Sequence, residues 1–89
     1  MKYISLLGAT GSIGKQTAAV VREHPQDFKI VALSAGRNID LVREYILEFK
    51  PELVSVQEKS DYDQLKSEFS KEGITFTYGD EGLVETAVY

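Results

Sequence analysis

The sequence predicts an α/β protein with an open, mostly parallel sheet and helices on both faces. Two observations lead to this class. Short apolar runs alternate with stretches in which apolar residues recur every three to four positions, and this strand–helix alternation repeats along the chain. A chain of 89 residues has room for one domain or part of one. Doubly wound nucleotide-binding sheets have about six strands in two halves, so only the first half is expected here.

Four segments are predicted to be strands. Lys2–Leu7 and Phe28–Ser34 are short, apolar and bounded by Gly or Pro, which is typical of buried strands. Leu53–Gln57 and Ile74–Tyr78 alternate apolar with polar residues, which favours positions nearer the edge of the sheet.

The first two intervening segments have helical spacing. In the first, the expected buried face consists of Ile13, Thr17, Val20 and Val21. In the second, Asn38 is the expected N-cap. The apolar stripe of that second helix is Leu41, Val42, Tyr45, Ile46 and Phe49.

Two further helices are expected. One begins near Ser60 or Asp61, with Asp61 and Gln64 as a capping pair, and ends at Gly73. The other begins near Asp80. Its apolar positions are Leu83, Val84 and Ala87.

Composition excludes several classes of protein. The absence of Cys rules out disulfides, thiolate nucleophiles and cysteine metal clusters, and it fits a reducing cytoplasm. No apolar run approaches the ~18 residues that would span a bilayer, and the first residues do not resemble a signal peptide. A net charge of −4 argues against nucleic-acid binding. We therefore expect neither a membrane nor a nucleic acid as partner.

The stretch Gly8-Ala9-Thr10-Gly11-Ser12-Ile13-Gly14 follows a predicted strand and opens a predicted helix, as a dinucleotide-binding turn requires. Gly8 allows the tight turn, Gly11 lets the backbone approach a pyrophosphate, and Gly14 lets the helix pack close to the sheet. The spacing is G-x-x-G-x-x-G, a variant found in several NADP-using families. The alternative is a tight turn that binds no ligand.

Donors to an anion are expected at the start of this helix. The amides of Gly11, Ser12 and Ile13 would lie where unpaired N–H groups and the helix dipole favour negative charge. The hydroxyls of Thr10 and Ser12 add further donors.

The end of the second strand indicates which nucleotide would bind. NAD-preferring sites usually place a carboxylate there, but Ser34-Ala35-Gly36-Arg37-Asn38 contains none. Arg37 is suited to pair with a 2′-phosphate, and Ser34 and Asn38 are further potential donors. The sequence thus predicts NADPH over NADH. The alternative is that Arg37 is a solvated cation and Asn38 only a helix cap.

The combination of Leu7–Gly14 with Val31-Ala32-Leu33 and Ala35-Gly36-Arg37-Asn38 closely resembles the N-terminus of the 1-deoxy-D-xylulose 5-phosphate reductoisomerase family. The resemblance covers only about the first fifth to quarter of such an enzyme. It implies a Rossmann-like fold and cofactor contacts by the positions matching Thr10, Gly11, Ser12, Ile13, Gly36, Arg37 and Asn38.

The resemblance also implies an activity. Family members are NADPH-dependent oxidoreductases of non-mevalonate isoprenoid biosynthesis. They convert 1-deoxy-D-xylulose 5-phosphate to 2-C-methyl-D-erythritol 4-phosphate with Mg²⁺ or Mn²⁺ and are usually cytoplasmic homodimers. Their catalytic and metal-binding residues and their C-terminal domain match nothing before Tyr89. Residues 1–89 are therefore expected to be the N-terminal part of an NADPH-binding domain, with no activity of their own and no catalytic or metal-binding residue.

Two other functional hypotheses stay open. The Gly8-Ala9-Thr10-Gly11 start also resembles semialdehyde dehydrogenases and other NADP-dependent reductases, although Ala35-Gly36-Arg37-Asn38 argues against them. A non-catalytic nucleotide-sensing module would instead fold alone at 89 residues. Under the reductoisomerase reading, Tyr3–Leu7 lacks a neighbour and exposes an apolar edge, so the isolated chain should be unstable or self-associate.

Overall fold

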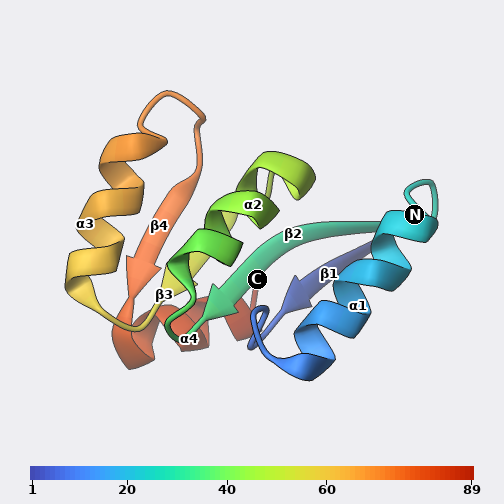
Figure 1. Cartoon of the computed structure of the whole chain (residues 1–89), viewed down its shortest axis with the longest axis horizontal. Coiled ribbons are helices and arrows are strands. Elements are labelled where there is room, and N and C mark those ends of the chain that lie inside the picture. Colours follow the sequence, from blue (N-terminus) through green and yellow to red (C-terminus); the bar gives the residue numbers. More distant parts are fainter.

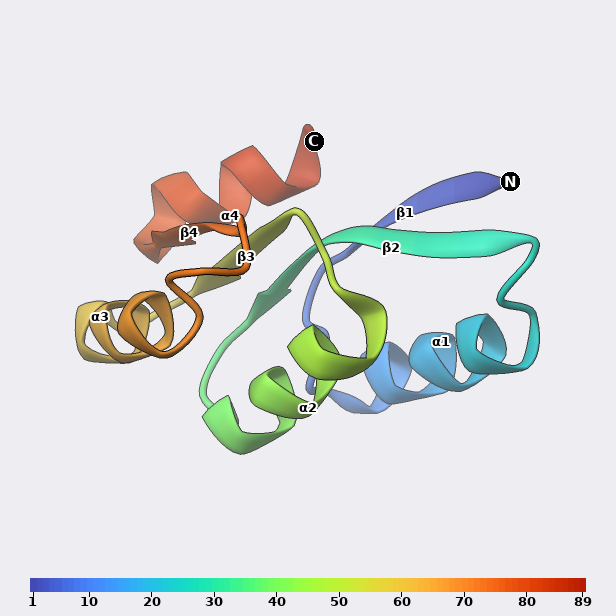
Figure 2. The same ribbon diagram turned by 90° about the horizontal axis from the view of Figure 1, so that it is seen from above.

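The computed structural model describes residues 1–89, in which four strands and four helices alternate. The strands are β1 (Lys2–Leu6), β2 (Phe28–Ala35), β3 (Leu53–Val56) and β4 (Thr75–Tyr78). The helices are α1 (Ser12–Glu23), α2 (Ile39–Phe49), α3 (Lys59–Glu68) and α4 (Gly79–Ala87). All neighbouring strands are parallel, in the order β1-β2-β3-β4. Figures 1 and 2 show α1, α2 and α3 on one face of the sheet and α4 on the other, which confirms the predicted class.

The two outer strands are less buried than the two inner ones. β1 pairs only with β2, so Tyr3 is 70% exposed, whereas Leu6 is buried at the carboxyl end of the strand. The prediction of a buried first strand was therefore wrong for its first half. β4 is the other edge strand, as expected, with Thr75 and Tyr78 exposed.

The edge position predicted for the third strand is wrong. β3 lies between β2 and β4, and all its residues are buried. The polar residue Ser55 suggested an exposed edge, but its side chain is covered by Gly82 of α4. A Cβ added to Gly82 of α4 would lie 2.4 Å from the Ser55 hydroxyl oxygen.

The buried face of α1 also differs from the prediction. Gly14, Ala18 and Val21 face the sheet, while Ile13 is 78% exposed and Val20 is 49% exposed. Small residues let the helix approach the strand-to-helix turn closely, so hydrophobicity alone found Val21 and missed Gly14 and Ala18.

α2 agrees with the prediction. The Asn38 side-chain oxygen accepts a hydrogen bond from the Leu41 amide at 3.3 Å, which makes it the N-cap. Val42, Tyr45 and Ile46 are buried in the core.

The capping pair predicted for α3 is absent. The helix begins at Lys59, its N-cap Glu58 makes no side-chain capping bond, and Asp61 already lies in the first turn. The helix also ends at Glu68, before the turn that contains Gly73.

α4 rests on the sheet through its small residues. Gly82 and Thr86 are buried, whereas Leu83 and Val84 are 43% and 61% exposed, so the apolar face predicted for this helix points outward. None of the four helices has the length and hydrophobicity needed to cross a bilayer.

Candidate nucleotide-binding site

A tight turn after β1 brings the chain into α1. Gly8 has a φ of +65°, a conformation that L side chains rarely adopt. The Gly11 amide donates to the Gly8 carbonyl at 3.0 Å, and the Ala9 amide donates to the Ser34 carbonyl at 2.8 Å. The turn is therefore closed on itself and tied to β2.

The start of α1 presents unpaired amides. The first helical backbone bond runs from the Lys15 amide to the Gly11 carbonyl at 2.9 Å, and the N-cap Gly11 has no side chain to offer. The amides of Ser12, Ile13 and Gly14 are thus the free donors of this helix. One detail differs from the sequence prediction, because the Gly11 amide is already used inside the turn.

The glycines of the site fall into two groups. Gly8 is required by its positive φ, and Gly14 by crowding, since a Cβ there would lie 2.4 Å from the Gly8 carbonyl oxygen. Gly11 and Gly36 are different. A Cβ on Gly11 would meet its nearest atom at an ordinary 3.5 Å, and one on Gly36 would meet nothing within 4 Å. The packing of the protein itself does not require these two glycines. They would be required if a ligand approached the protein backbone closely at these positions.

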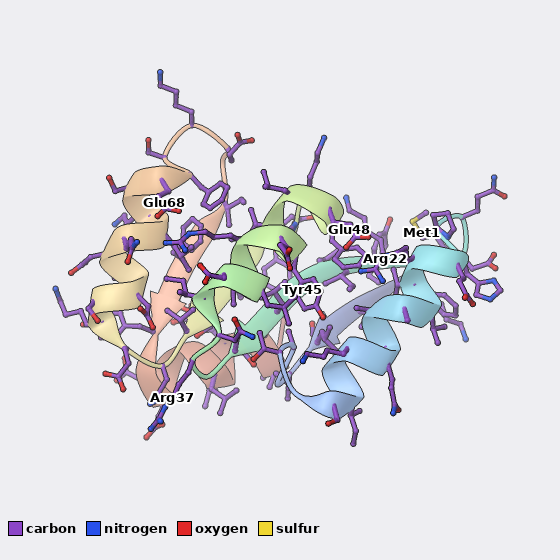
Figure 3. The ribbon with its side chains drawn as sticks, in the orientation of Figure 1. Met1, Arg22, Arg37, Tyr45, Glu48 and Glu68 are labelled. Carbon is purple, nitrogen blue, oxygen red and sulfur yellow. The ribbon has the colours of Figure 1, made fainter.

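The carboxyl end of β2 lies beside this turn. Arg37 is exposed, forms none of the ion pairs in the structure and extends from the carboxyl end of the sheet (Figure 3). Asn38 caps α2 with its side-chain oxygen, which leaves its amide group free to donate. The Ser34 hydroxyl oxygen accepts a hydrogen bond from the Gly8 amide at 3.3 Å, which leaves its O–H free to donate to a ligand, as predicted for this residue.

A hollow of about 280 Å³ lies at the carboxyl ends of β1, β2 and β3, where Gly8 and Gly36 line it. The free amides of α1, Arg37 and Asn38 are not among its lining residues. This end of a parallel sheet is where doubly wound proteins bind their ligands. Its walls are formed by Gly8, Ser34, Ala35, Gly36, Ser55, Val56, Gln57, Gly79 and Leu83.

The sequence prediction did not include Gln57, Gly79 and Leu83, which also line the hollow. The available signal was that every strand of a parallel sheet ends at the same edge, so residues after β3 and β4 belong beside the glycine turn. Leu83, which is 43% exposed on α4, lines the hollow together with the strand ends.

No group of three or more His, Cys, Asp or Glu side chains is arranged to hold a metal ion. Another hollow, of about 300 Å³, lies at the amino end of the sheet between Arg22, Phe28 and Phe49. It is remote from the free amides of α1 and from Arg37 (Figure 3).

Residues 4–89 match the family model of 1-deoxy-D-xylulose 5-phosphate reductoisomerase. The chain belongs to this family. It is 53% identical over 89 residues to the reductoisomerase of Shouchella clausii and 53% identical to that of Listeria welshimeri. In both cases the whole chain aligns with 23% of the relative, so it spans about a quarter of the length of these reductoisomerases. The match sets aside the semialdehyde dehydrogenase alternative.

Solved reductoisomerase structures have the same fold. A crystal structure of DOX-P reductoisomerase in complex with NADPH, fosmidomycin and magnesium superimposes with a TM-score of 0.89 at 34% identity, over 98% of this chain and 22% of that one. The Zymomonas mobilis reductoisomerase in complex with NADPH superimposes with a TM-score of 0.87 at 27% identity, over 97% of this chain and 23% of that one. These superpositions confirm the Rossmann-like fold that the family resemblance implied.

Proposed function

We propose that this chain binds the adenosine 2′-phosphate and pyrophosphate groups of NADPH, as the first part of the cofactor domain of a reductoisomerase. The proposal rests on two features found together. The start of α1 has free amides, and Gly11 and Gly36 are glycines that the protein's own packing does not require. The proposed binding residues are Gly8, Thr10, Gly11, Ser12, Ile13, Gly14, Gly36, Arg37 and Asn38.

Each part of the site suits one part of the cofactor. The amides of Ser12 and Ile13 would hold the pyrophosphate, and Gly11 and Gly36 leave space for the ligand to approach the backbone. Arg37 would pair with the 2′-phosphate. The nearest acidic residue along the chain, Asp40, accepts a hydrogen bond from Arg43 at 2.6 Å, which partly offsets its charge because Arg43 also pairs with Glu68. These features favour NADPH over NADH.

For the whole protein we propose the conversion of 1-deoxy-D-xylulose 5-phosphate to 2-C-methyl-D-erythritol 4-phosphate, in a cytoplasmic homodimer. NADPH supplies the hydride for that reduction, and Mg²⁺ or Mn²⁺ would be held by residues outside this chain. Reductoisomerase structures with NADPH, magnesium and fosmidomycin support the proposal. The residues described here would bind and orient the cofactor, and none of them is assigned a catalytic role.

The test uses a full-length chimera in which residues 1–89 replace the matching segment of the Listeria welshimeri reductoisomerase. Arg37→Asp should weaken NADPH binding by about 10- to 100-fold, because a charged hydrogen bond is lost and a like charge is introduced. NADH binding should change little. Lys71→Asp makes the same change of charge in the exposed turn after α3 and should leave both affinities unaltered. Unchanged NADPH affinity in Arg37→Asp would refute the role of Arg37.

A further inference from the structure

Ser34 connects the two halves of the candidate site. It lies near the carboxyl end of β2 and is 5% exposed. Its hydroxyl oxygen accepts the Gly8 amide at 3.3 Å, and its carbonyl accepts the Ala9 amide at 2.8 Å. One residue of β2 therefore engages two successive amides of the glycine turn. The side-chain bond is the component that a substitution can remove.

The bond from Ser34 extends through Gly8 to the free amides of α1. The Gly8 carbonyl accepts the Gly11 amide at 3.0 Å and lies against Gly14 in the first turn of the helix. The orientation of the Gly8 residue thus sets the direction in which α1 begins. Because Gly8 has a positive φ and no side chain, its own chemistry restrains it little. An external contact is needed to hold it in one conformation.

We propose that Ser34 is a positioning residue for the pyrophosphate site. Its hydroxyl holds the Gly8 peptide, and through it the free amides of Ser12 and Ile13, at the orientation an anion requires. This inference rests on the proposed function, because it names what orders the donors of that same site. It differs from the role of Arg37, since pyrophosphate is common to NADPH and NADH whereas the 2′-phosphate is not.

A buried hydroxyl at this position has a cost that the bond to Gly8 offsets. Ser34 is buried, and its partner across the β2–β3 pair, on the same face of the sheet, is the buried Ser55. A buried hydroxyl oxygen needs a hydrogen-bond partner, and the Gly8 amide provides one. Ser34→Ala removes only the hydroxyl, so it tests the bond to Gly8 without adding bulk to the strand.

The test compares Ser34→Ala with Thr86→Val in the full-length chimera. Thr86 is a fully buried residue of α4 whose hydroxyl donates to the Gly82 carbonyl at 2.9 Å. The control therefore removes one buried side-chain hydrogen bond outside the proposed site. Ser34→Ala should raise the dissociation constants of NADPH and NADH together by about three- to tenfold, the loss expected for one neutral hydrogen bond. Ser34→Thr keeps the hydroxyl and should restore binding.

Hydrogen exchange separates this inference from the proposed function. The segment that contains the Gly8 amide should exchange faster in ligand-free Ser34→Ala, but not in Thr86→Val, whichever nucleotide binds. If Ser34→Ala exchanges faster but the unmodified chimera binds no NADPH, the proposed function is refuted, while the bond between Ser34 and the Gly8 amide still holds the turn. Unchanged exchange, or a NADPH-to-NADH affinity ratio that shifts as it does in Arg37→Asp, would overturn the role assigned to Ser34.

Discussion

The carbonyl oxygen of Gly8 lies so close to Gly14 that a Cβ on Gly14 would be 2.4 Å from it. The Ala9 carbonyl oxygen would be 2.5 Å from the same Cβ. Both atoms belong to the backbone, so neither can move aside as a flexible side chain would. The first turn of α1 can therefore pack on the glycine turn only if position 14 has no side chain.

Gly14→Ala should destabilise the chain by about 1–3 kcal/mol, the usual cost of overpacking. The sign of this stability change tests the packing, because replacing Gly by Ala inside a helix normally stabilises a protein by about 0.5–1 kcal/mol. Gly36→Ala is the matched control for stability, since its Cβ would meet nothing within 4 Å, and it should change stability by less than about 0.5 kcal/mol. Urea unfolding of both variants measures the difference. A stabilised Gly14→Ala would contradict the packing described here.

Gly8→Ala tests conformation without crowding. A Cβ on Gly8 would meet nothing within 4 Å, but its φ of +65° should cost about 1–2 kcal/mol with a side chain present. Gly73 has the same freedom from contacts and a φ of +71° in the turn after α3, so Gly73→Ala should cost about as much. In the full-length chimera, only Gly8→Ala should also weaken NADPH binding. Equal NADPH affinities in the two variants would argue that the glycine turn does not contact the cofactor.

The sequence was a reliable guide wherever a requirement is local. The strand–helix order, the Asn38 cap and the strand–turn–helix context of the glycines depend on neighbours along the chain, and the structure contains all of them. It was a poor guide to which helix face is buried. α1 packs on the glycine turn through Gly14, and α4 rests on the sheet through Gly82; a hydrophobicity pattern has no signal at either glycine.

Errors about strand position have a related cause. A polar residue in β3 suggested an edge, yet Ser55 is buried because a glycine of α4 lies over it. β1 was expected to be buried on the strength of its apolar residues, but burial of a strand depends on the number of its neighbours. Such information is contained in the pairing of distant segments, which composition and periodicity do not reveal.

An ion pair between α1 and α2 should make stability depend on pH. Arg22 donates two hydrogen bonds to the Glu48 carboxylate, which hold the pKa of Glu48 below its ordinary value of 4.5 (Figure 3). A pKa that is lower in the folded state stabilises the fold above the unfolded value and loses that effect as pH falls through the folded value. The contribution of the pair should therefore be present near pH 7 and be lost in acid, as the pH falls through the folded pKa of Glu48.

Glu48→Gln measures this contribution. Its urea midpoint should lie below that of the unmodified chain near pH 7, and the two midpoints should converge as the pH falls through the folded pKa of Glu48. Because both side chains are partly exposed, added salt should also narrow the gap. Glu44→Gln, on the same helix and in none of the ion pairs, should follow the unmodified chain throughout. A gap that does not narrow as the pH falls would show that the effect of Glu48 is not its charge.

The free edge of β1 predicts self-association of the isolated 89-residue chain. Unpaired backbone groups and the 70% exposed Tyr3 lie along this edge, and exposed strand edges pair readily with other strands. Light scattering should give a mass above 9.9 kDa that rises with concentration. Tyr3→Lys should lower that mass, because a charge on an edge strand opposes pairing. Val84→Lys, on the exposed face of α4, should leave the mass unchanged. If the unmodified chain is a stable monomer that unfolds cooperatively, an independent nucleotide-binding module is favoured instead.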